Sequence, residues 1–280
     1  MPLLTLLTDF GTTDYYVAAV KGTVLRRAPG TVLVDVAHDV APGDLAAGAF
    51  LLAASVPWQP AGAVHLAVVD PGVGSRRRIL AARLAKPEAW VVVPDNGLLT
   101  HLLEGGLTGD VAVGGVWSVT RGDLFLPGPG STFHGRDRFA PVAAHLLNGG
   151  AAEEIGEAIA DPVRLPGEPR LLGSGRLVGS VLHIDRFGNL VTDLPTAWLP
   201  DGPCLAAVAG KETSVRASHY RELPTGEPGL LPGSLGTLEL ALGNGDLARF
   251  WQVERGARVA IRWPSDAHSR QGAKEQFGLQ

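Results

Sequence analysis

The stretch that decides the fold class spans residues 3–36 and reads LLTLLTDFGTTDYYVAAVKGTVLRRAPGTVLVDV. Its apolar beginning, residues 3–7, is typical of a buried strand, and residues 31–36 form a second, β-branched strand. Between them, residues 14–27 are predicted to form a helix that begins at an Asp cap and ends before Pro29-Gly30. A strand, a helix and a strand in this order indicate parallel pairing and an α/β layer architecture.

The same alternation continues through the first half of the chain. Residues 44–56 and 136–147 are predicted helices, because each is apolar and each is followed by Pro or Gly. The other elements predicted here are strands at residues 63–69 and 90–93 and a short helix at residues 97–103. The first half therefore predicts an α/β domain around a mainly parallel sheet.

The pattern changes after about residue 160. Residues 161–169 are rich in Pro and Gly and are typical of a linker. Short strands split by turns follow, at residues 176–184, 190–193, 205–208, 237–242 and 258–262. We therefore predict an α/β domain over residues 1–165 and a smaller, mainly β domain of barrel or sandwich type over residues 166–280. The polar residues from 265 onward are predicted to form an irregular tail.

The composition limits the classes of function. With 45% hydrophobic and 19% charged residues, the 280-residue chain can bury a normal core. A net charge of −4 argues against a general nucleic-acid binder. Cys204 is the single cysteine, which excludes an intramolecular disulfide and fits a reducing compartment, so we expect a cytoplasmic protein. No basic leader opens the sequence, and its longest apolar stretch, residues 46–56, is too short for a membrane span.

Four predicted strands end in an acid followed closely by glycine. The segments are Asp9-Phe10-Gly11, Asp70-Pro71-Gly72, Asp95-Asn96-Gly97 and Asp185-Arg186-Phe187-Gly188-Asn189. Any one of them alone is more often a turn, because Asp, Asn, Gly and Pro are the turn residues. Four at similar positions favour a shared cleft, since α/β folds bind ligands at strand ends.

Two further segments carry chemistry near these acids. Arginines at 76, 77 and 78 follow the Asp70 turn, and Arg77 can fold back to keep Asp70 ionised and in place. His134 precedes a helix in the segment Ser131-Thr132-Phe133-His134-Gly135-Arg136-Asp137. The residues support a capping loop and a site histidine equally well.

Other motifs do not support the function that they resemble. Asp9-Phe10-Gly11 lacks the phosphate loop and strand lysine of a kinase, and Gly72-Val73-Gly74 lacks the third glycine of a dinucleotide fingerprint. Residues 128–132 have no lysine for a phosphate loop. The eight histidines show no metal-ligand spacing, so no metal site is expected. Three of them lie within or beside strands and are predicted to be structural: His38, His65 and His183.

The ordered set of motifs resembles the S-adenosylmethionine (SAM) hydroxide adenosyltransferases, or SAM hydrolases, which are relatives of the SAM-dependent fluorinase and chlorinase. The matching segments are Leu7-Thr8-Asp9-Phe10-Gly11-Thr12-Thr13-Asp14, Val34-Asp35-Val36-Ala37-His38, Val69-Asp70-Pro71-Gly72-Val73-Gly74, Val93-Pro94-Asp95-Asn96-Gly97, Phe133-His134-Gly135-Arg136-Asp137, Asp185-Arg186-Phe187-Gly188-Asn189, Ser234-Leu235-Gly236 and Gly243-Asn244-Gly245. Each is short, but together and in this order they are specific.

The resemblance implies a fold, an assembly and an activity. The family has an α/β N-terminal domain and a smaller β C-terminal domain. Its members look like homotrimers, with the site between one chain's N-terminal domain and a neighbour's C-terminal domain. They hydrolyse SAM to adenosine and methionine with an Asp, an Arg and a His, which correspond to Asp70, Arg77 and His134. SAM is the substrate, so no cofactor is expected.

The resemblance also selects the hydrolase over the halogenases. The halogenases have Tyr at the position of Asp70, and the fluorinase has Ser at the position of Gly135. The remaining roles implied are Asp9 on the ribose hydroxyls, Asp185 and Asn189 on the methionine part, Phe187 stacked on the adenine, Ser234 on the methionine carboxylate, and the backbones of Leu242 and Asn244 on the adenine edge. The halogenases have one more residue between the counterparts of Asp185 and Phe187, which shifts the register there.

The chemistry expected is in-line attack of water on C5′ of the ribose, because the sulfonium of SAM is a good leaving group. Alignment alone can contribute roughly 7–11 kcal/mol. Beside Arg77, Asp70 is a weak base, so we expect it to orient water, with Arg77 stabilising hydroxide-like charge and His134 completing the cage. The alternatives are a SAM-dependent halogenase and a non-catalytic SAM or adenosine-binding protein.

Overall fold

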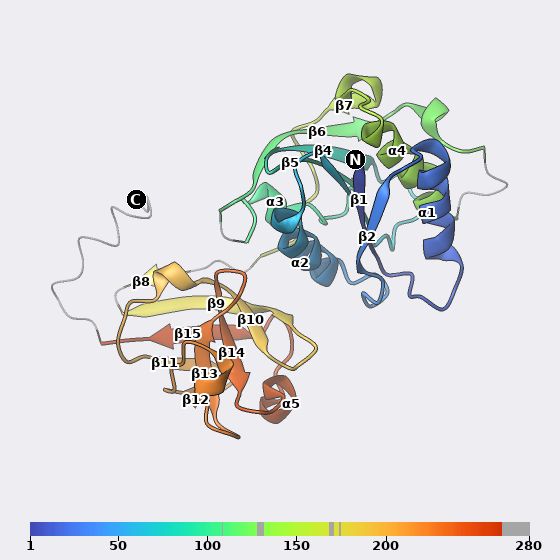
Figure 1. Cartoon of the computed structure of the whole chain (residues 1–280). Coiled ribbons are helices and arrows are strands. Elements are labelled where there is room, and N and C mark those ends of the chain that lie inside the picture. The colour runs from blue at the N-terminus through green and yellow to red at the C-terminus, as the bar shows by residue number, and fades with distance from the viewer. Residues whose placement is uncertain (108, 128–131, 168–170, 174, 265–280) are drawn as a thin grey trace. The chain divides into compact units, whose positions relative to one another are not determined.

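The computed structural model describes the whole chain except residues 108, 128–131, 168–170, 174 and 265–280 (Figure 1). The chain divides into two compact units, Met1–Pro166 and Gly167–Gln280. Part of the motif at residues 128–132 and the predicted tail from residue 265 lie outside the described residues. No helix of the described part is long and apolar enough to span a bilayer.

The first unit is built on a seven-stranded sheet in the order β2-β1-β3-β5-β4-β6-β7. Its parallel part comprises β1 (Leu3–Thr8), β2 (Val32–Ala37), β3 (Ala63–Val68) and β5 (Glu88–Pro94). The remaining strands pair antiparallel: β4 (Ile79–Lys86), β6 (Ala112–Val119) and β7 (Gly156–Ala158). The α/β prediction is confirmed, although the sequence analysis did not predict these three antiparallel strands.

Helices cover both faces of this sheet. α1 (Tyr16–Arg27) and α4 (Ala140–Leu147) pack on the face that carries Leu4 and Leu6. α2 (Leu45–Ser55) and α3 (Thr100–Leu103) pack on the face that carries Leu7. Successive strand residues point to opposite faces, so an apolar strand such as β1 supplies both cores. The described residues of this unit also form short helical turns: η1 (Val56–Trp58), η2 (Gly122–Leu124), η3 (Gly135–Phe139) and η4 (Ala152–Glu154).

Two helix starts show how side chains set element boundaries. The Asp44 carboxylate accepts a hydrogen bond from Ala47 N at 3.0 Å and caps α2, as a helix from residue 44 predicts. The predicted Asp cap of the first helix is wrong, because α1 begins at Tyr16 after Tyr15, which makes no side-chain cap hydrogen bond. Asp14 therefore lies in the loop that follows β1 rather than in the helix.

The second unit is an antiparallel sheet in the order β12-β11-β15-β9-β10-β14-β13, with β8 paired to β9. Strands from both ends of this order contribute to one apolar core, which includes Val208, Ile261, Leu190 and Leu230. The prediction of a smaller, mainly β part is confirmed. Its elements are β8 (Leu171–Gly173), β9 (Arg176–Ile184), β10 (Leu190–Pro195), η5 (Thr196–Trp198), β11 (Leu205–Val208), β12 (Lys211–Thr213), η6 (Tyr220–Glu222), β13 (Pro228–Pro232), β14 (Thr237–Leu242), α5 (Leu247–Trp251) and β15 (Arg258–Arg262).

Candidate active site

Three of the four strand-end acids gather at one edge of the first unit. β1, β3 and β5 are neighbouring parallel strands, so their carboxyl ends meet at the same edge of the sheet. Asp9 follows β1, Asp70 follows β3 and Asp95 follows β5. This is the edge where open α/β sheets bind ligands. The fourth acid, Asp185, belongs to the second unit.

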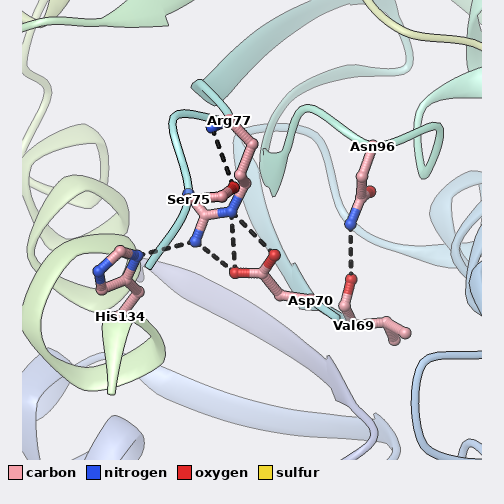
Figure 2. Close-up of polar contacts among 6 residues, drawn as sticks. All are labelled: Val69, Asp70, Ser75, Arg77, Asn96 and His134. Carbon is pink, nitrogen blue, oxygen red and sulfur yellow. Dashed lines mark hydrogen bonds and ion pairs between the residues drawn. The ribbon is translucent and has the colours of Figure 1, made fainter. Parts of the chain in front are cut away.

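Asp70 and Arg77 form a buried, two-pronged ion pair across a tight turn (Figure 2). Arg77 Nε donates to the two Asp70 carboxylate oxygens at 2.8 and 2.9 Å, and Arg77 Nη2 also donates to Oδ2. The two side chains are 8% and 5% exposed. The turn between them is closed by Val73 N and Ser75 N, which donate to main-chain carbonyls within it. A carboxylate held in this way has a fixed orientation.

His134 contacts the same guanidinium nitrogen, Arg77 Nη2, that donates to Asp70 (Figure 2). Its Nδ1 lies 2.8 Å from Arg77 Nη2, and because arginine can only donate, Nδ1 is the acceptor. The proton of the neutral ring is therefore on Nε2, a buried atom that has no hydrogen-bond partner among the described residues. Burial, and then the charges of Arg138 and Arg77, lower the pKa of His134. The order is Asp70, Arg77, His134, with arginine in the middle.

The helix that carries His134 starts with a π-helical turn, η3, which continues into α4. His134 makes no side-chain cap hydrogen bond there, so its imidazole does not cap the helix, and its role in a site stays a prediction. The same turn brings Phe139 under the Arg77 guanidinium, 5.0 Å from the ring centroid. Such turns are frequent at functional sites, because one extra residue re-aims the side chains around it.

Asp9 is held by the main chain of a neighbouring loop. Its Oδ2 accepts a hydrogen bond from Gly43 N at 2.9 Å. His38 supports the same segment twice: its Nδ1 lies 2.8 Å from Thr8 Oγ1, and its carbonyl accepts from Gly11 N at 2.8 Å. His38 therefore has the structural role predicted for it. It holds the segment that carries Asp9, the residue predicted to bind the ribose.

In the second unit, Asp185 and Asn189 come together in one turn. Asp185 Oδ1 accepts from Phe187 N and Asn189 N, each at 2.9 Å, and Asn189 Nδ2 donates to Asp185 Oδ2 at 2.8 Å. The Phe187 side chain extends from this turn and is 74% exposed. An exposed ring on a rigid turn is suited to stacking on a flat ligand.

The other predicted binding residues lie in two turns of the same unit. Ser234 is exposed between β13 and β14. After β14, the Leu242 carbonyl accepts from Gly245 N at 3.1 Å, and Asn244 adopts a φ of 55°. Asn244 Nδ2 donates to Thr225 Oγ1 at 2.9 Å. Their roles toward a ligand stay predictions.

A half-exposed tyrosine paired with a buried glutamate near Asp185 was not predicted from the sequence. Tyr220 Oη donates to Glu239 Oε2 at 2.6 Å, and Glu239 is 5% exposed. Val191 pairs with both His183 and Glu239, so by strand alternation Glu239 shares a sheet face with Asp185 and Asn189. Burial and the charge of Asp185 raise the pKa of Glu239. The available signal was a charged residue in the middle of the apolar strand TLELAL.

The described residues contain no group of three His, Cys, Asp or Glu side chains arranged to hold a metal ion. At the centre of the site, one buried arginine lies between a carboxylate and a neutral imidazole. This arrangement can orient a small nucleophile and stabilise negative charge on it.

Comparisons with known proteins show the family of this chain. Residues 4–156 match the family model of the SAM hydroxide adenosyltransferase N-terminal domain, and residues 179–260 match that of the C-terminal domain. The chain is 41% identical to a protein of Thermus thermophilus named (R)-S-adenosyl-L-methionine hydrolase, covering 91% of this chain and 97% of the relative. A fluorinase of Actinoplanes sp. is 29% identical, over 69% of this chain and 72% of the relative.

A solved structure gives the same result for the fold. The crystal structure of an uncharacterised conserved protein from Thermotoga maritima superimposes with a TM-score of 0.85 at 31% identity, covering 93% of this chain and all of that one. The resemblance seen in the motifs is thereby confirmed over both parts of the chain. The chain belongs to the SAM hydroxide adenosyltransferase family.

Proposed function

We propose that this protein hydrolyses S-adenosyl-L-methionine to adenosine and L-methionine by attack of water on C5′ of the ribose. The observation that carries the proposal is the buried contact of Arg77 with both Asp70 and His134. The family relationship supports the same reaction, since relatives at 41% and 37% identity over more than nine-tenths of the chain are named SAM hydrolases. The Asp at position 70 supports hydrolysis rather than halide transfer.

In this mechanism the three side chains position and polarise water rather than remove a proton outright. Asp70 already accepts two-pronged hydrogen bonds from a cation, which fixes its carboxylate in place as an orienting acceptor. Arg77 stabilises negative charge that develops on the attacking oxygen. His134 keeps Arg77 in place through Nδ1 and presents its Nε2 proton as a donor. Methionine leaves with the electron pair of the C5′–sulfur bond, and the proton released by the attacking water passes to solvent.

The substrate contacts are divided between the two units in this proposal. Asp9 binds the ribose hydroxyls, and the backbones of Leu242 and Asn244 bind the adenine edge. Phe187 stacks on the adenine, and Asp185, Asn189 and Ser234 bind the methionine part. The pre-formed Asp185–Asn189 turn and the exposed Phe187 ring support these assignments.

The stereochemistry of the substrate is part of the proposal. The relatives at 41% and 37% identity are named hydrolases of the (R) form of SAM. We therefore expect the epimer that is R at sulfur to be preferred. Separate incubation with each purified epimer measures the preference, and equal kcat/KM for the two would contradict it.

The direct test is chromatography of SAM incubated with the protein, scoring adenosine and methionine. Asp70→Asn and Arg77→Ala should each lose most turnover while still binding SAM. Arg76→Ala is the matched control, because Arg76 is the exposed neighbour of Arg77 and should keep full activity. Full activity of purified Asp70→Asn would refute the role of Asp70. Product in the form of 5′-halo-adenosine with chloride or fluoride would indicate a halogenase, and binding without product a SAM-binding protein.

We also propose a homotrimer whose site combines the first unit of one chain with the second unit of a neighbour. The family relationship supports it, as does the division of the residues: Asp70 and Arg77 belong to one unit and Asp185 and Asn189 to the other. Light scattering after gel filtration tests the trimer. Mixing inactive Asp70→Asn with inactive Asn189→Ala subunits should restore part of the activity, and failure of exchanged trimers to do so would contradict a shared site.

The remaining parts of the proposal concern location and cofactors. The enzyme acts in the cytoplasm, which the single Cys204 supports, and it needs neither a metal ion nor a cofactor. Activity that survives dialysis against a chelator would support metal independence, and activity restored only by a divalent cation would contradict it.

A further inference from the structure

Asp95, the third acid at the strand ends, has no assigned role in the reaction. It is 7% exposed and lies at the end of β5. Its carboxylate accepts from Arg78 Nε at 2.6 Å and from Val163 N at 2.8 Å. Its own main-chain N–H donates to the Arg78 carbonyl at 3.0 Å. Asp95 therefore holds residue 78 by both the side chain and the main chain.

Arg78 is the residue after Arg77, and it spans a buried and an exposed carboxylate. Its Nη1 donates to Asp161 Oδ1 and its Nη2 to the Asp161 carbonyl, each at 2.8 Å. The Asp161 side chain is 78% exposed, whereas that of Asp95 is almost fully buried. An exposed ion pair contributes little, so the buried pair with Asp95 is the one expected to fix Arg78.

Because of strand geometry, the position of Arg78 also sets the direction of the Arg77 side chain. Ile79 pairs with Pro94 in the β4–β5 ladder, so residue 78 lies beside Asp95 as the ladder continues. Successive side chains of an extended chain point to opposite sides. Arg78 is held toward Asp95, and Arg77 therefore points to the other side, where it meets Asp70 and His134 (Figure 2).

The same loop also supports the other partner of the ion pair. Asn96, the neighbour of Asp95, donates from Nδ2 to the Val69 carbonyl at 2.9 Å, directly before Asp70 (Figure 2). The turn between Asp70 and Arg77 is mostly exposed and includes Val73, an exposed apolar residue. A turn with so little packing of its own depends on its flanks for a fixed shape.

We infer that Asp95 is a positioning residue that aims Arg77 at Asp70 by holding Arg78 on the opposite side of the chain. The inference rests on the proposed function, because it concerns how the hydrolytic arginine is oriented. Asp95 does not touch the reacting atoms. Its loss should loosen the alignment of Arg77, and a misplacement of about 1 Å can cost on the order of 100-fold in rate.

The test compares Asp95→Asn and Arg78→Ala with the control Asp161→Asn, using adenosine release from SAM. The first two should lower kcat about 10-fold or more and leave KM within about threefold, since the binding residues are untouched. Asp161→Asn removes only the exposed partner of Arg78 and should stay within about twofold of wild type. Thermal unfolding is measured for each variant, and Arg78→Ala remains informative if Asp95→Asn does not fold.

A double-mutant cycle separates positioning from a general loss of stability. Arg77→Lys should lower kcat by itself, and adding Asp95→Asn to it should lower kcat little further if Asp95 acts through Arg77. Additive losses in the folded double variant would overturn the inference. So would wild-type kcat in both Asp95→Asn and Arg78→Ala, with hydrolysis by the wild-type enzyme intact. A wild-type protein that releases no adenosine overturns the proposed function and this inference with it.

Discussion

At the scale of single residues, the arrangement depends on what each side chain can donate. Arg77 has only donors, so both of its neighbours must accept, and Asp70 and the Nδ1 lone pair of His134 do so. Removing one member of a buried ion pair leaves the other charge unpaired, at a cost of about 3–5 kcal/mol. Variants of Asp70 or Arg77 therefore need a folding control beside each activity measurement.

A prediction follows for His134, which acts as an acceptor toward Arg77. His134→Asn retains an acceptor and should keep kcat within about tenfold of wild type, whereas His134→Ala should lose up to about 100-fold. The difference reflects a hydrogen bond to a charged group, about 1.5–3 kcal/mol, converted to a rate. Steady-state kinetics measure both variants, and equal losses would show that the acceptor is not what matters.

The pH dependence of kcat tests the role of His134 in a second way. Burial lowers the pKa of His134 below its ordinary 6.5, so the ring is neutral at pH 7 and its Nδ1 lone pair is available. Activity should fall only on the acid side, where protonation removes that acceptor and places two cations together. Because Asn does not titrate, His134→Asn should lack this acid limb in its kcat profile, and an unchanged limb would assign it to another group.

At the scale of elements, the turn that carries Phe187 packs against the start of α5. Gly188 adopts a φ of 83°, and a Cβ built there would meet the Asp246 carboxylate at 2.0 Å and its Cα at 2.9 Å. The Asp246 side chain caps α5 by accepting from Arg249 N at 2.8 Å. A side chain at residue 188 would therefore displace Asp246, and this displacement would break the cap of α5.

Gly188→Ala should therefore lower the free energy of unfolding by more than the cost of a left-handed backbone conformation alone. Gly256 is the matched control, because it has a φ of 84° and nothing within 4 Å of its Cβ position. Gly256→Ala should cost about 1–2 kcal/mol in urea unfolding, the ordinary left-handed penalty. Gly188→Ala should cost at least about 1 kcal/mol more through the lost cap, and should raise the KM for SAM. Equal losses would mean that Asp246 moves aside freely.

At the scale of the whole molecule, a buried histidine makes folding stability depend on pH. His65 lies within β3 with no exposed surface, and its Nδ1 lies 2.8 Å from Thr5 Oγ1 in β1. Burial lowers the pKa of His65 from 6.5 to about 4. The unfolded chain therefore takes up a proton at a pH where the folded chain does not.

The free energy of unfolding should consequently fall as the pH drops from 6.5 to 4. His65 contributes its full stabilisation above pH 6.5, and this contribution is lost progressively down to about pH 4, by an amount on the order of 3 kcal/mol. Urea unfolding across this range should show a shallower slope for His65→Gln than for wild type. His219→Gln, at a solvated histidine, is the control and should leave the slope unchanged.

The amino-acid order alone predicted the elements with a strong local pattern. Apolar runs and Gly/Pro stops are properties of neighbouring residues, so β1, β3, α2 and β9 could be predicted within a residue or two. The strand-end acids and the family resemblance could also be recognised from the sequence, including Asp rather than Tyr at position 70. β4, β6 and β7 were missed, because they are defined by antiparallel partners rather than by a pattern of their own.

Only the tertiary structure decided how the site is assembled. Whether His134 caps a helix or meets Arg77 depends on a π-helical turn and on packing between segments 57 residues apart. The buried Glu239 and the support of Arg77 by Asp95 depend equally on strand register. Local periodicity specifies which residues are buried, but contacts between distant segments are specified by how the strands pair and pack.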